Sequence, residues 1–400
     1  MYRVPLAYNT LQRDEIEAAI RVLRSGQMTQ GSAVASFEAA FAKSQNAKFA
    51  IMVNSGSSAN LIGIEAVVYC SFLKPDITFG PLQSGDEVII QGLSWPTTIK
   101  PLLNHGLQPV YCDVDLSTLN ATVNTIDAVR TAKSRAVIAV PILGNPSGLD
   151  EIRAYCETNR LILIEDACES LGAVTPSGNT VGRLGLASAF SFYFSHHIST
   201  VEGGAILTDS ADIADLCYSL RSHGWTRHFK LERFSFPDTD EVDPRFCFVL
   251  PGYNVRSTDI AAAIGSVQLD RFPQMLVNRR RIAKGRIRSI ESFANKVTIP
   301  GSAIADQHSW MAFPLMLNDG SHRKQAQEFL EASGIETRPI IAGNLLRHPL
   351  TRMHNLKKDQ PRLPACDRVF ERGLMIGLNP FSTDVMEEHI HRTLQAAAAL

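Results

Sequence analysis

The sequence predicts an α/β protein with a mostly parallel sheet flanked by helices and a smaller C-terminal α/β domain. Short apolar runs of strand length alternate with helical stretches as far as Thr208. This alternation is typical of a parallel sheet that is covered on both faces. Near Asp270 the pattern changes to a basic helical stretch, then to short strands such as 310–317 and a final helix. We therefore expect a large domain over residues 1–265 and a small domain over residues 266–400.

The segment before the first strand predicts an amphipathic helix. Its apolar residues recur at helical spacing between Thr10, a possible cap, and Gly26, a stop. The predicted strands of the large domain follow at residues 49–53, 87–90, 109–112, 136–140, 161–164, 188–192 and 204–208. Residues 233–240 are rich in turn formers, which indicates either a loop that covers a site or an inert surface loop. The basic run 278–286 is typical of a solvated helix face.

Composition and charge indicate a globular protein whose partner is a small molecule. The formal net charge is −1 at pH 7 and no long basic run is present, so the charge pattern of a nucleic-acid or anionic-membrane binder is missing. No signal-peptide pattern and no stretch of roughly 20 apolar residues was found, so we expect a cytoplasmic protein. The seven cysteines are scattered, which favours free thiols and no metal site.

The residues that follow each strand are the first candidates for a site, because ligands of open α/β sheets lie beyond the carboxyl ends of the strands. Gly56 and Ser57 follow the first strand and begin a helix. Glycine permits close backbone approach, and a helix N-terminus offers free N–H donors to a phosphate. Taken alone, such a turn is more often only a helix cap. Ser191 lies in the predicted strand 188–192, five positions before His196, and could also donate to a phosphate, although an ordinary strand serine gives the same signal.

Two further strand ends carry residues that suit a flat, cationic ring. Asp166 follows the strand 161–164 and could hold a pyridinium nitrogen protonated, which keeps such a ring an electron sink. The alternative is an aspartate that caps a neighbouring loop. Trp95 follows the strand 87–90 and could stack on a flat cofactor, or it could be an ordinary buried tryptophan.

His196 is the most informative single residue, because an imidazole can move a proton at neutral pH. It is followed directly by His197. Two adjacent histidines rarely face one metal ion, and no third ligand is near in the sequence, so a metal site is disfavoured. For either ring taken singly, a hydrogen-bonded structural histidine is the alternative.

Taken together, these motifs resemble the DegT/DnrJ/EryC1/StrS family of pyridoxal-phosphate-dependent sugar aminotransferases, which have fold type I, over nearly the whole chain. The matching segments are residues 53–59, 84–89, 112–115, 164–167, 190–192, 202–205 and 252–256. At the position of His196 this family normally has the lysine that bonds the cofactor. Histidine there, with the runs 195–200 and 221–227, is similar to the dehydratase branch of the family. The cysteines are too sparse for the iron–sulfur motif of the branch that needs a reductase.

The resemblance implies a cofactor, pyridoxal 5'-phosphate or pyridoxamine 5'-phosphate, and a role for each candidate. Asp166 would pair with the pyridinium nitrogen and Trp95 would stack on the ring. Gly56, Ser57 and Ser191 would hold the phosphate, and Glu169, where the aminotransferases commonly have glutamine, would lie at the polar edge of the ring. Asn254 would reach the cofactor of a second subunit, which implies a homodimer with shared active sites. His223 and Arg256 would contact the carboxylates of L-glutamate or the phosphates of a nucleotide sugar.

The reaction that the resemblance implies is removal of the C3 hydroxyl from a nucleotide-linked 4-keto-6-deoxy sugar, expected to be GDP-4-keto-6-deoxy-D-mannose. L-glutamate would supply the amino group, and the product would belong to 3,6-dideoxysugar biosynthesis of the colitose type, for an O-antigen. His196 would remove a proton from the cofactor and return it to the departing hydroxyl. Two alternatives stay open. One is a sugar 4-aminotransferase in which Lys230 replaces the missing lysine, and the other is a catalytically silent module that binds a sugar nucleotide.

Overall fold

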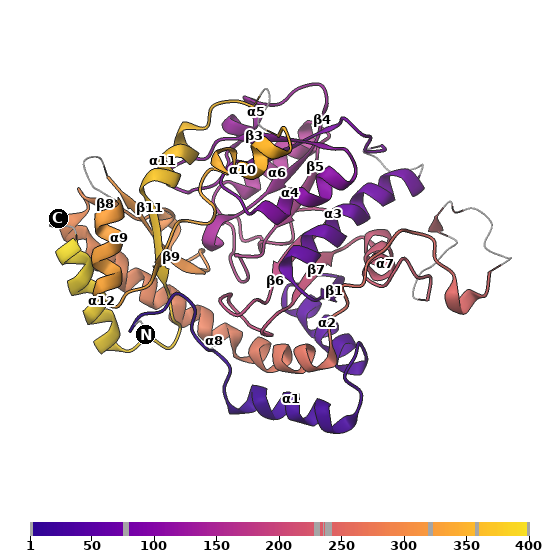
Figure 1. Ribbon diagram of the computed structural model, residues 1–400, viewed down its shortest axis with the longest axis horizontal. Helices are drawn as coiled ribbons and strands as arrows, with labels where there is room; N and C mark the ends of the chain where they lie inside the picture. The colour runs from indigo at the N-terminus through magenta and orange to yellow at the C-terminus, as the bar shows by residue number, and fades with distance from the viewer. Residues whose placement is uncertain are drawn as a thin grey trace.

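The computed structural model describes residues 3–74, 80–227, 233–234, 236, 242–318, 323–356 and 360–397. A seven-stranded sheet lies between two layers of helices, and a four-stranded sheet lies beside it (Figure 1). The predicted α/β architecture is therefore confirmed. Lys230 and most of the predicted loop 233–240 lie outside the described residues.

The large sheet contains all the strands that the sequence predicts for it. In spatial order they are β1 (Phe49–Val53), β7 (Gly204–Thr208), β6 (Ser188–Ser191), β5 (Ile162–Asp166), β4 (Ser134–Ala139), β2 (Glu87–Gln91) and β3 (Gln108–Cys112). Only β7 runs antiparallel to its neighbours, β1 and β6. The carboxyl ends of β1, β5 and β6 therefore meet at the same edge of the sheet, where the sequence predicts a site.

The two faces of the sheet are covered by different helices, because alternate strand residues point to opposite sides. Ile51 and Val53 of β1 pack in one core and Ala50 and Met52 in the other. The first core includes α3 (Gly56–Leu73), α4 (Pro96–Asn104) and α7 (Ala211–Leu220). The second includes α2 (Ser32–Ser44), α5 (Val123–Asp127) and α6 (Leu149–Thr158).

The helix α3 is an apolar core helix. By length and composition alone it could cross a membrane, and it is the one such helix among the described residues. However, 67% of its apolar window is buried inside the fold. Its apolar side chains pack against the sheet and against α4 and α7, which is the ordinary environment of a central helix.

The predicted N-terminal helix is confirmed as α1 (Arg13–Ser25), with one correction at its start. Gln12 is the N-cap residue, and its amide donates to Glu15 Oε2. The Thr10 hydroxyl instead donates to Gln268 Oε1, so Thr10 ties the segment to a distant helix rather than capping α1. Gly26 adopts φ +74° and ends the helix, as glycine commonly does.

A long helix, α8 (Asp259–Ile290), runs beneath both sheets and connects them (Figure 1). The second sheet is antiparallel, in the order β10 (Thr337–Arg338), β11 (Gly373–Gly377), β9 (Ala312–Leu317) and β8 (Val297–Thr298). Around it lie α9 (Arg323–Ala332), α10 (Pro349–Met353), α11 (Pro364–Arg372) and α12 (Asp384–Ala397). Val4 also packs in the core of this part. The predicted boundary at residue 265 falls inside α8, and the division into domains stays a prediction.

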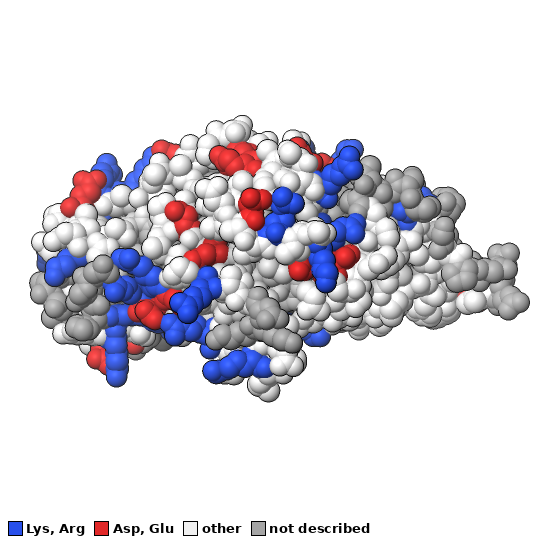
Figure 2. Space-filling model, turned by 90° about the horizontal axis from the view of Figure 1, so that it is seen from above, with Lys and Arg blue, Asp and Glu red and all other residues white. Residues whose placement is uncertain are grey.

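The basic run in α8 is not the solvated face that its charge predicts. Arg279 and Arg286 are each only 3% exposed, and both donate to buried backbone carbonyls. Elsewhere the charges are mixed, and Figure 2 shows basic and acidic side chains interspersed over the face that it displays.

Candidate active site

One cavity of about 640 Å³ opens at the carboxyl ends of β1, β5 and β6, and the second sheet closes its other side. It brings together most of the predicted site residues. They are Gly56, Ser57, Trp95, Asp166, Glu169, Ser191 and His196. The second sheet adds Arg338 and its ion-pair partner Glu336, whose nitrogen and oxygen are 2.6 Å apart. Neither residue belongs to a motif that the sequence analysis could single out.

The first turn of α3 forms a cradle against the end of β6. Ser55 is the N-cap of α3, and its Oγ accepts from the Ser58 amide at 3.1 Å. A Cβ on Gly56 would lie 2.5 Å from the Ser191 Cβ, so only glycine lets the turn approach β6 this closely. Ser57 Oγ lies 2.9 Å from Thr97 Oγ1. The free amides of a helix N-terminus beside these hydroxyls fit a phosphate group.

Asp166 is held at the end of β5 by neutral donors and is 5% exposed. Its Oδ2 accepts from Asn60 Nδ2 at 2.9 Å and from Thr98 Oγ1 at 2.6 Å. Its Oδ1 has only a long contact, 3.4 Å, with the Cys168 amide. Neutral donors orient a carboxylate without cancelling its charge. Asp166 can therefore accept a hydrogen bond from a cationic ring nitrogen.

The neighbouring carboxylate, Glu165, points to the other face of β5 and is structural. It accepts from the amides of Gly182, Leu184 and Gly185 and from the Ser188 hydroxyl. Burial raises the pKa of Glu165, and these donors work against that effect. Because alternate strand residues point to opposite faces, Glu165 binds the loop 182–185 and Asp166 points to the cavity.

His196 lies in a tight loop between β6 and β7, in which its amide donates to the Tyr193 carbonyl at 2.9 Å. His196 Nδ1 is 2.7 Å from the Cys168 carbonyl oxygen. Because a carbonyl only accepts, Nδ1 carries the hydrogen and Nε2 is left with a free lone pair. Burial lowers the pKa of His196, although the Cys168 carbonyl and Asp166 oppose the effect. The neutral ring can therefore receive a proton at Nε2.

His197 has the opposite environment, although it is the next residue. It is 1% exposed, and its Nε2 is 3.1 Å from the Ser309 carbonyl oxygen. Burial holds the pKa of His197 well below its usual value. For His197 the structural alternative is the better description. Within the described ranges, no group of three or more His, Cys, Asp and Glu side chains is placed to hold a metal ion.

Glu169 lines the cavity and lies three residues after the end of β5. Its Oε2 accepts from the Leu143 amide at 2.8 Å. Burial raises the pKa of Glu169 to about 8, with a smaller contribution from the charge of Asp166, while the Leu143 amide works against both. At neutral pH this side chain is mostly protonated, so it can donate a hydrogen bond as well as accept one.

Trp95 is not the ordinary buried tryptophan that was the alternative. It is the N-cap of α4, with Pro96 at the first helical position. Its side chain is 55% exposed and lines the cavity. An indole left open beside Asp166 can stack on a flat ring.

The remaining predicted residues, His223, Asn254 and Arg256, lie outside this cavity. Arg256 Nε donates to Asn254 Oδ1 at 3.1 Å, and Arg256 Nη2 is 3.5 Å from His223 Nε2. His223 and Arg256 line a shallow surface hollow together with Trp225 and Phe248. Within one chain, these three residues therefore do not line the cavity that contains His196. Their predicted role in the site of a second subunit stays a prediction.

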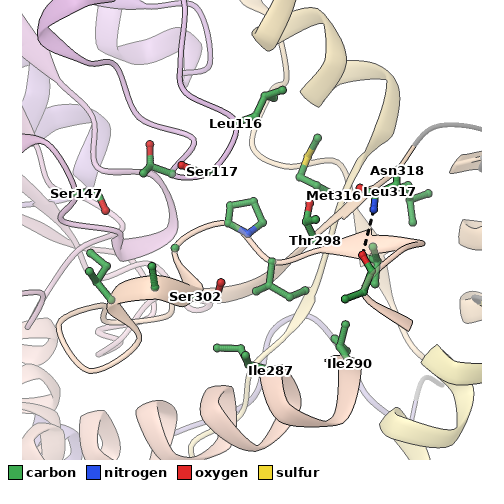
Figure 3. Close-up of a pocket in the computed structure, with 18 of the residues that line it drawn as sticks. Leu116, Ser117, Ser147, Ile287, Ile290, Thr298, Ser302, Met316, Leu317 and Asn318 are labelled. Carbon is green, nitrogen blue, oxygen red and sulfur yellow. Dashed lines mark hydrogen bonds between the residues drawn. The ribbon is translucent and has the colours of Figure 1, made fainter. Parts of the chain in front are cut away.

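A second cavity, of about 610 Å³, lies between a loop of the large sheet and the second sheet (Figure 3). Ile287 and Ile290 of α8 point into it, and Ser117, Ser147 and Ser302 lie at its rim. It contains none of the predicted site residues. The first cavity is therefore the candidate active site.

The fold and this site define a class of protein, and comparison with known proteins agrees. Residues 9–396 match the DegT/DnrJ/EryC1/StrS aminotransferase family, so the chain belongs to this family. The family prediction is therefore confirmed.

Three relatives are informative. The GDP-4-keto-6-deoxy-D-mannose 3-dehydratase of Escherichia coli O55:H7 is 38% identical over 352 residues, which are 87% of this chain and 88% of the relative. A solved structure of the E. coli GDP-4-keto-6-deoxy-D-mannose-3-dehydratase with bound hydrated PLP has a TM-score of 0.87 at 33% identity, covering 98% of this chain and 100% of that chain. A structure of a GDP-4-keto-6-deoxymannose-3-dehydratase with a trapped PLP-glutamate geminal diamine has a TM-score of 0.87 at 32% identity, with the same coverage. The predicted aminotransferase fold type I is confirmed.

Proposed function

We propose that this chain is a 3-dehydratase that removes the C3 hydroxyl of GDP-4-keto-6-deoxy-D-mannose with pyridoxal phosphate and L-glutamate. The observation that carries this proposal is His196 at the floor of a cavity in which no described lining residue is a lysine. The names of the relatives, which include the sugar substrate, PLP and a PLP-glutamate adduct, support it. The coverage of nearly the whole chain supports a shared reaction rather than a shared fold alone.

The residues of the cavity fit the cofactor part by part. The cradle of Gly56 and Ser57, with Ser191, would hold the phosphate, and a Cβ at Gly56 would close the cradle. Asp166 would hold the ring nitrogen and Trp95 would cover a ring face. When bound, the cofactor would supply an electron sink and an amino group for the C4 ketone of the sugar.

His196 is the residue that moves protons. Its Nε2 lone pair, set by the Nδ1 contact with the Cys168 carbonyl, would take a proton from the cofactor carbon. Hydroxide is a poor leaving group, and protonated Nε2 would then donate to the departing C3 hydroxyl, which leaves as water. A lysine there would instead favour delivery of the proton to C4 and thus an amino sugar.

The overall reaction balances without another oxidant or reductant. Glutamate is oxidised to 2-oxoglutarate, and its two electrons end in the new C3–H bond of the sugar. The nitrogen is released as ammonia when water restores the C4 ketone. One water is released and one is consumed.

We also propose that the enzyme is a homodimer with shared active sites and that it acts in the cytoplasm. His223, Asn254 and Arg256 are grouped outside the cavity, which supports a role for them in the site of a second chain. The seven cysteines are all free thiols in the structure, which suits a reducing compartment.

The experiment is product analysis by mass spectrometry and NMR after incubation with pyridoxal phosphate, glutamate and GDP-4-keto-6-deoxy-D-mannose. We expect a sugar that has lost one oxygen at C3 and kept its C4 ketone, with one 2-oxoglutarate and one ammonia per turnover. A 4-amino sugar would establish the aminotransferase alternative. Unchanged sugar with bound cofactor would point to the silent module.

A further inference from the structure

Arg279 of α8 is a buried cation that the proposed reaction does not use. It is 3% exposed, and its Nη1 donates to the carbonyl oxygens of Trp310, Met311 and Leu378 at 3.0, 3.1 and 2.8 Å. In the part of the chain that the structure describes, no carboxylate forms an ion pair with it. Burying an unpaired charge is costly. We therefore expect that the protein keeps Arg279 because its hydrogen bonds fix the backbone at these three carbonyls.

The segment that Arg279 holds docks on a loop of the large sheet through a short backbone seam. We use the name seam for residues 143–144 and 309–311. The Ser309 amide donates to the Gly144 carbonyl at 3.0 Å, and the Met311 amide donates to the Leu143 carbonyl at 2.8 Å. Leu143 has φ +53° and Trp310 has φ +51°. Left-handed backbone is strained for residues other than glycine, and such residues cluster at functional sites.

Both sides of the seam reach the candidate active site. On one side, the strained Leu143 donates its amide to Glu169 Oε2 at 2.8 Å. On the other side, the Ser309 carbonyl lies 3.1 Å from His197 Nε2, directly beside His196 in the chain. Met311 lines the cavity itself. The seam thus connects α8 with Glu169 and with the loop that carries His196, the two side chains of the cavity that can exchange protons.

We propose that Arg279 is a positioning residue of the active site, which pins the seam so that Leu143 stays bonded to Glu169 and His197 keeps His196 in place. The inference rests on the proposed function for the roles of His196 and Glu169. Its geometry does not depend on which sugar the enzyme converts.

The charge of Arg279 supports this assignment in a second way. It helps to lower the pKa of both His196 and His197, after burial, and therefore favours the neutral ring that receives a proton. Asp166 acts on His196 in the opposite direction. Lysine at position 279 would keep the charge and lose the forked donors, so it separates position from charge.

The test compares Arg279→Lys with Arg286→Lys in the holoenzyme. Arg286 is the matched control, because it is equally buried on the same helix and its guanidinium bonds the Gly377 carbonyl and the Glu387 carboxylate, which are not part of the seam. Two quantities are measured. One is hydrogen exchange at the Leu143 and Met311 amides. The other is the rate at which glutamate converts the cofactor to its amine form, followed by absorbance, with the glutamate concentration at half saturation.

In Arg279→Lys we expect both amides to exchange about tenfold or more faster, since a local opening becomes easier. We expect the conversion rate to fall about tenfold while the half-saturating glutamate concentration changes less than about twofold, because positioning acts on the transition state. Arg286→Lys should leave both quantities unchanged. Equal loss in the two variants, or faster exchange without a slower conversion, would overturn the proposal.

If Arg279→Lys does not fold, Gly144→Ala tests the same seam with Arg279 intact. A Cβ there would lie 2.1 Å from Ser309 Oγ, and Gly144 has φ +93°. The same pair of changes is expected, and their absence contradicts the proposal. Failure of the proposed function is distinguishable, because a wild-type enzyme that makes an amino sugar still carries out the glutamate step.

Discussion

The cavity at His196 and the cavity at Ile287 and Ile290 have nearly the same volume, about 640 Å³ and about 610 Å³. Both lie where loops of the large sheet meet the second part of the chain. They differ in their polar atoms. The first holds Asp166, Glu169 and His196, each with a fixed hydrogen-bond partner. The second is lined mostly by aliphatic side chains and small hydroxyls, and its charged residues, Glu291 and Arg368, do not lie at strand ends of the large sheet. Volume alone does not identify a site, and fixed titratable groups at strand ends do.

Of the substitutions that test the difference between the two cavities, His196→Asn is expected to reduce the dehydration rate most. Asparagine fills a similar volume but cannot carry a proton, so we expect dehydration to slow by about 10²–10⁴-fold, the usual contribution of a general acid–base. Cofactor affinity should change little, because His196 does not belong to the cradle. Steady-state rates and cofactor titration measure the two quantities. A dehydration rate close to that of the wild type would remove His196 from the mechanism.

A smaller effect is expected at the support of Asp166. Thr98→Val keeps the shape of the side chain and removes the hydroxyl that donates to Asp166 Oδ2 at 2.6 Å. Loss of a hydrogen bond to a charged group costs about 1.5–3 kcal/mol, so we expect cofactor binding to weaken by roughly tenfold or more. Equilibrium dialysis of the cofactor measures this. Unchanged affinity would show that Asn60 alone orients Asp166.

The pH dependence of Glu169 is the next test. The folded protein keeps its proton up to pH about 8, and the ordinary value is 4.5. The native state therefore binds more protons than the unfolded state between these values, and stability falls as pH rises through this window. Glu169→Gln cannot titrate, so its stability relative to the wild type should increase over the same window.

Urea unfolding of both proteins at several pH values measures this difference. The catalytic rate gives a second reading, because the glutamine amide donates at every pH whereas Glu169 stops donating above pH about 8. A parallel stability profile for the two proteins would place the pKa of Glu169 near its ordinary value and contradict the account of its burial.

The smallest effect is expected in the second cavity. Ser302 is exposed at its rim (Figure 3), and Ser302→Ala removes one surface hydroxyl. We expect the catalytic rate and the stability to stay near the wild type, within about 0.5 kcal/mol for the latter. A large loss of dehydration in this variant would break the comparison, since it would give the second cavity a part in the reaction.

Much of the fold was predictable because its signals are local. The strands of the large sheet are short apolar runs between turns, and the rule for strand ends led to Gly56, Trp95 and Asp166. Asn60 was missed, although it had a signal: it is a polar residue one turn after Gly56 in an apolar helix. Thr98 had no signal in the sequence, because its contact with Asp166 joins two separate segments.

The basic run of α8 shows why charge alone misled the sequence prediction. Arg279 and Arg286 are spaced by two helical turns, and Ile282 and Ala283 lie between them on the same face. This stripe faces the core around the four-stranded sheet, where carbonyl oxygens near the end of β11 accept hydrogen bonds from the guanidinium groups. The helical periodicity of the run is visible in the sequence. Only the tertiary fold shows that backbone carbonyls accept hydrogen bonds from both arginines.

The most direct test of the central claim is the tautomer of His196, read by NMR of the holoenzyme with ¹⁵N-labelled histidine and assigned with His196→Asn. We predict that the His196 ring is neutral at pH 7. Its Nδ1 carries the hydrogen and donates it to the Cys168 carbonyl, and its Nε2 is unprotonated. Hydrogen on Nε2 with Nδ1 unprotonated would contradict this prediction, because the ring would then have no lone pair directed at the cavity.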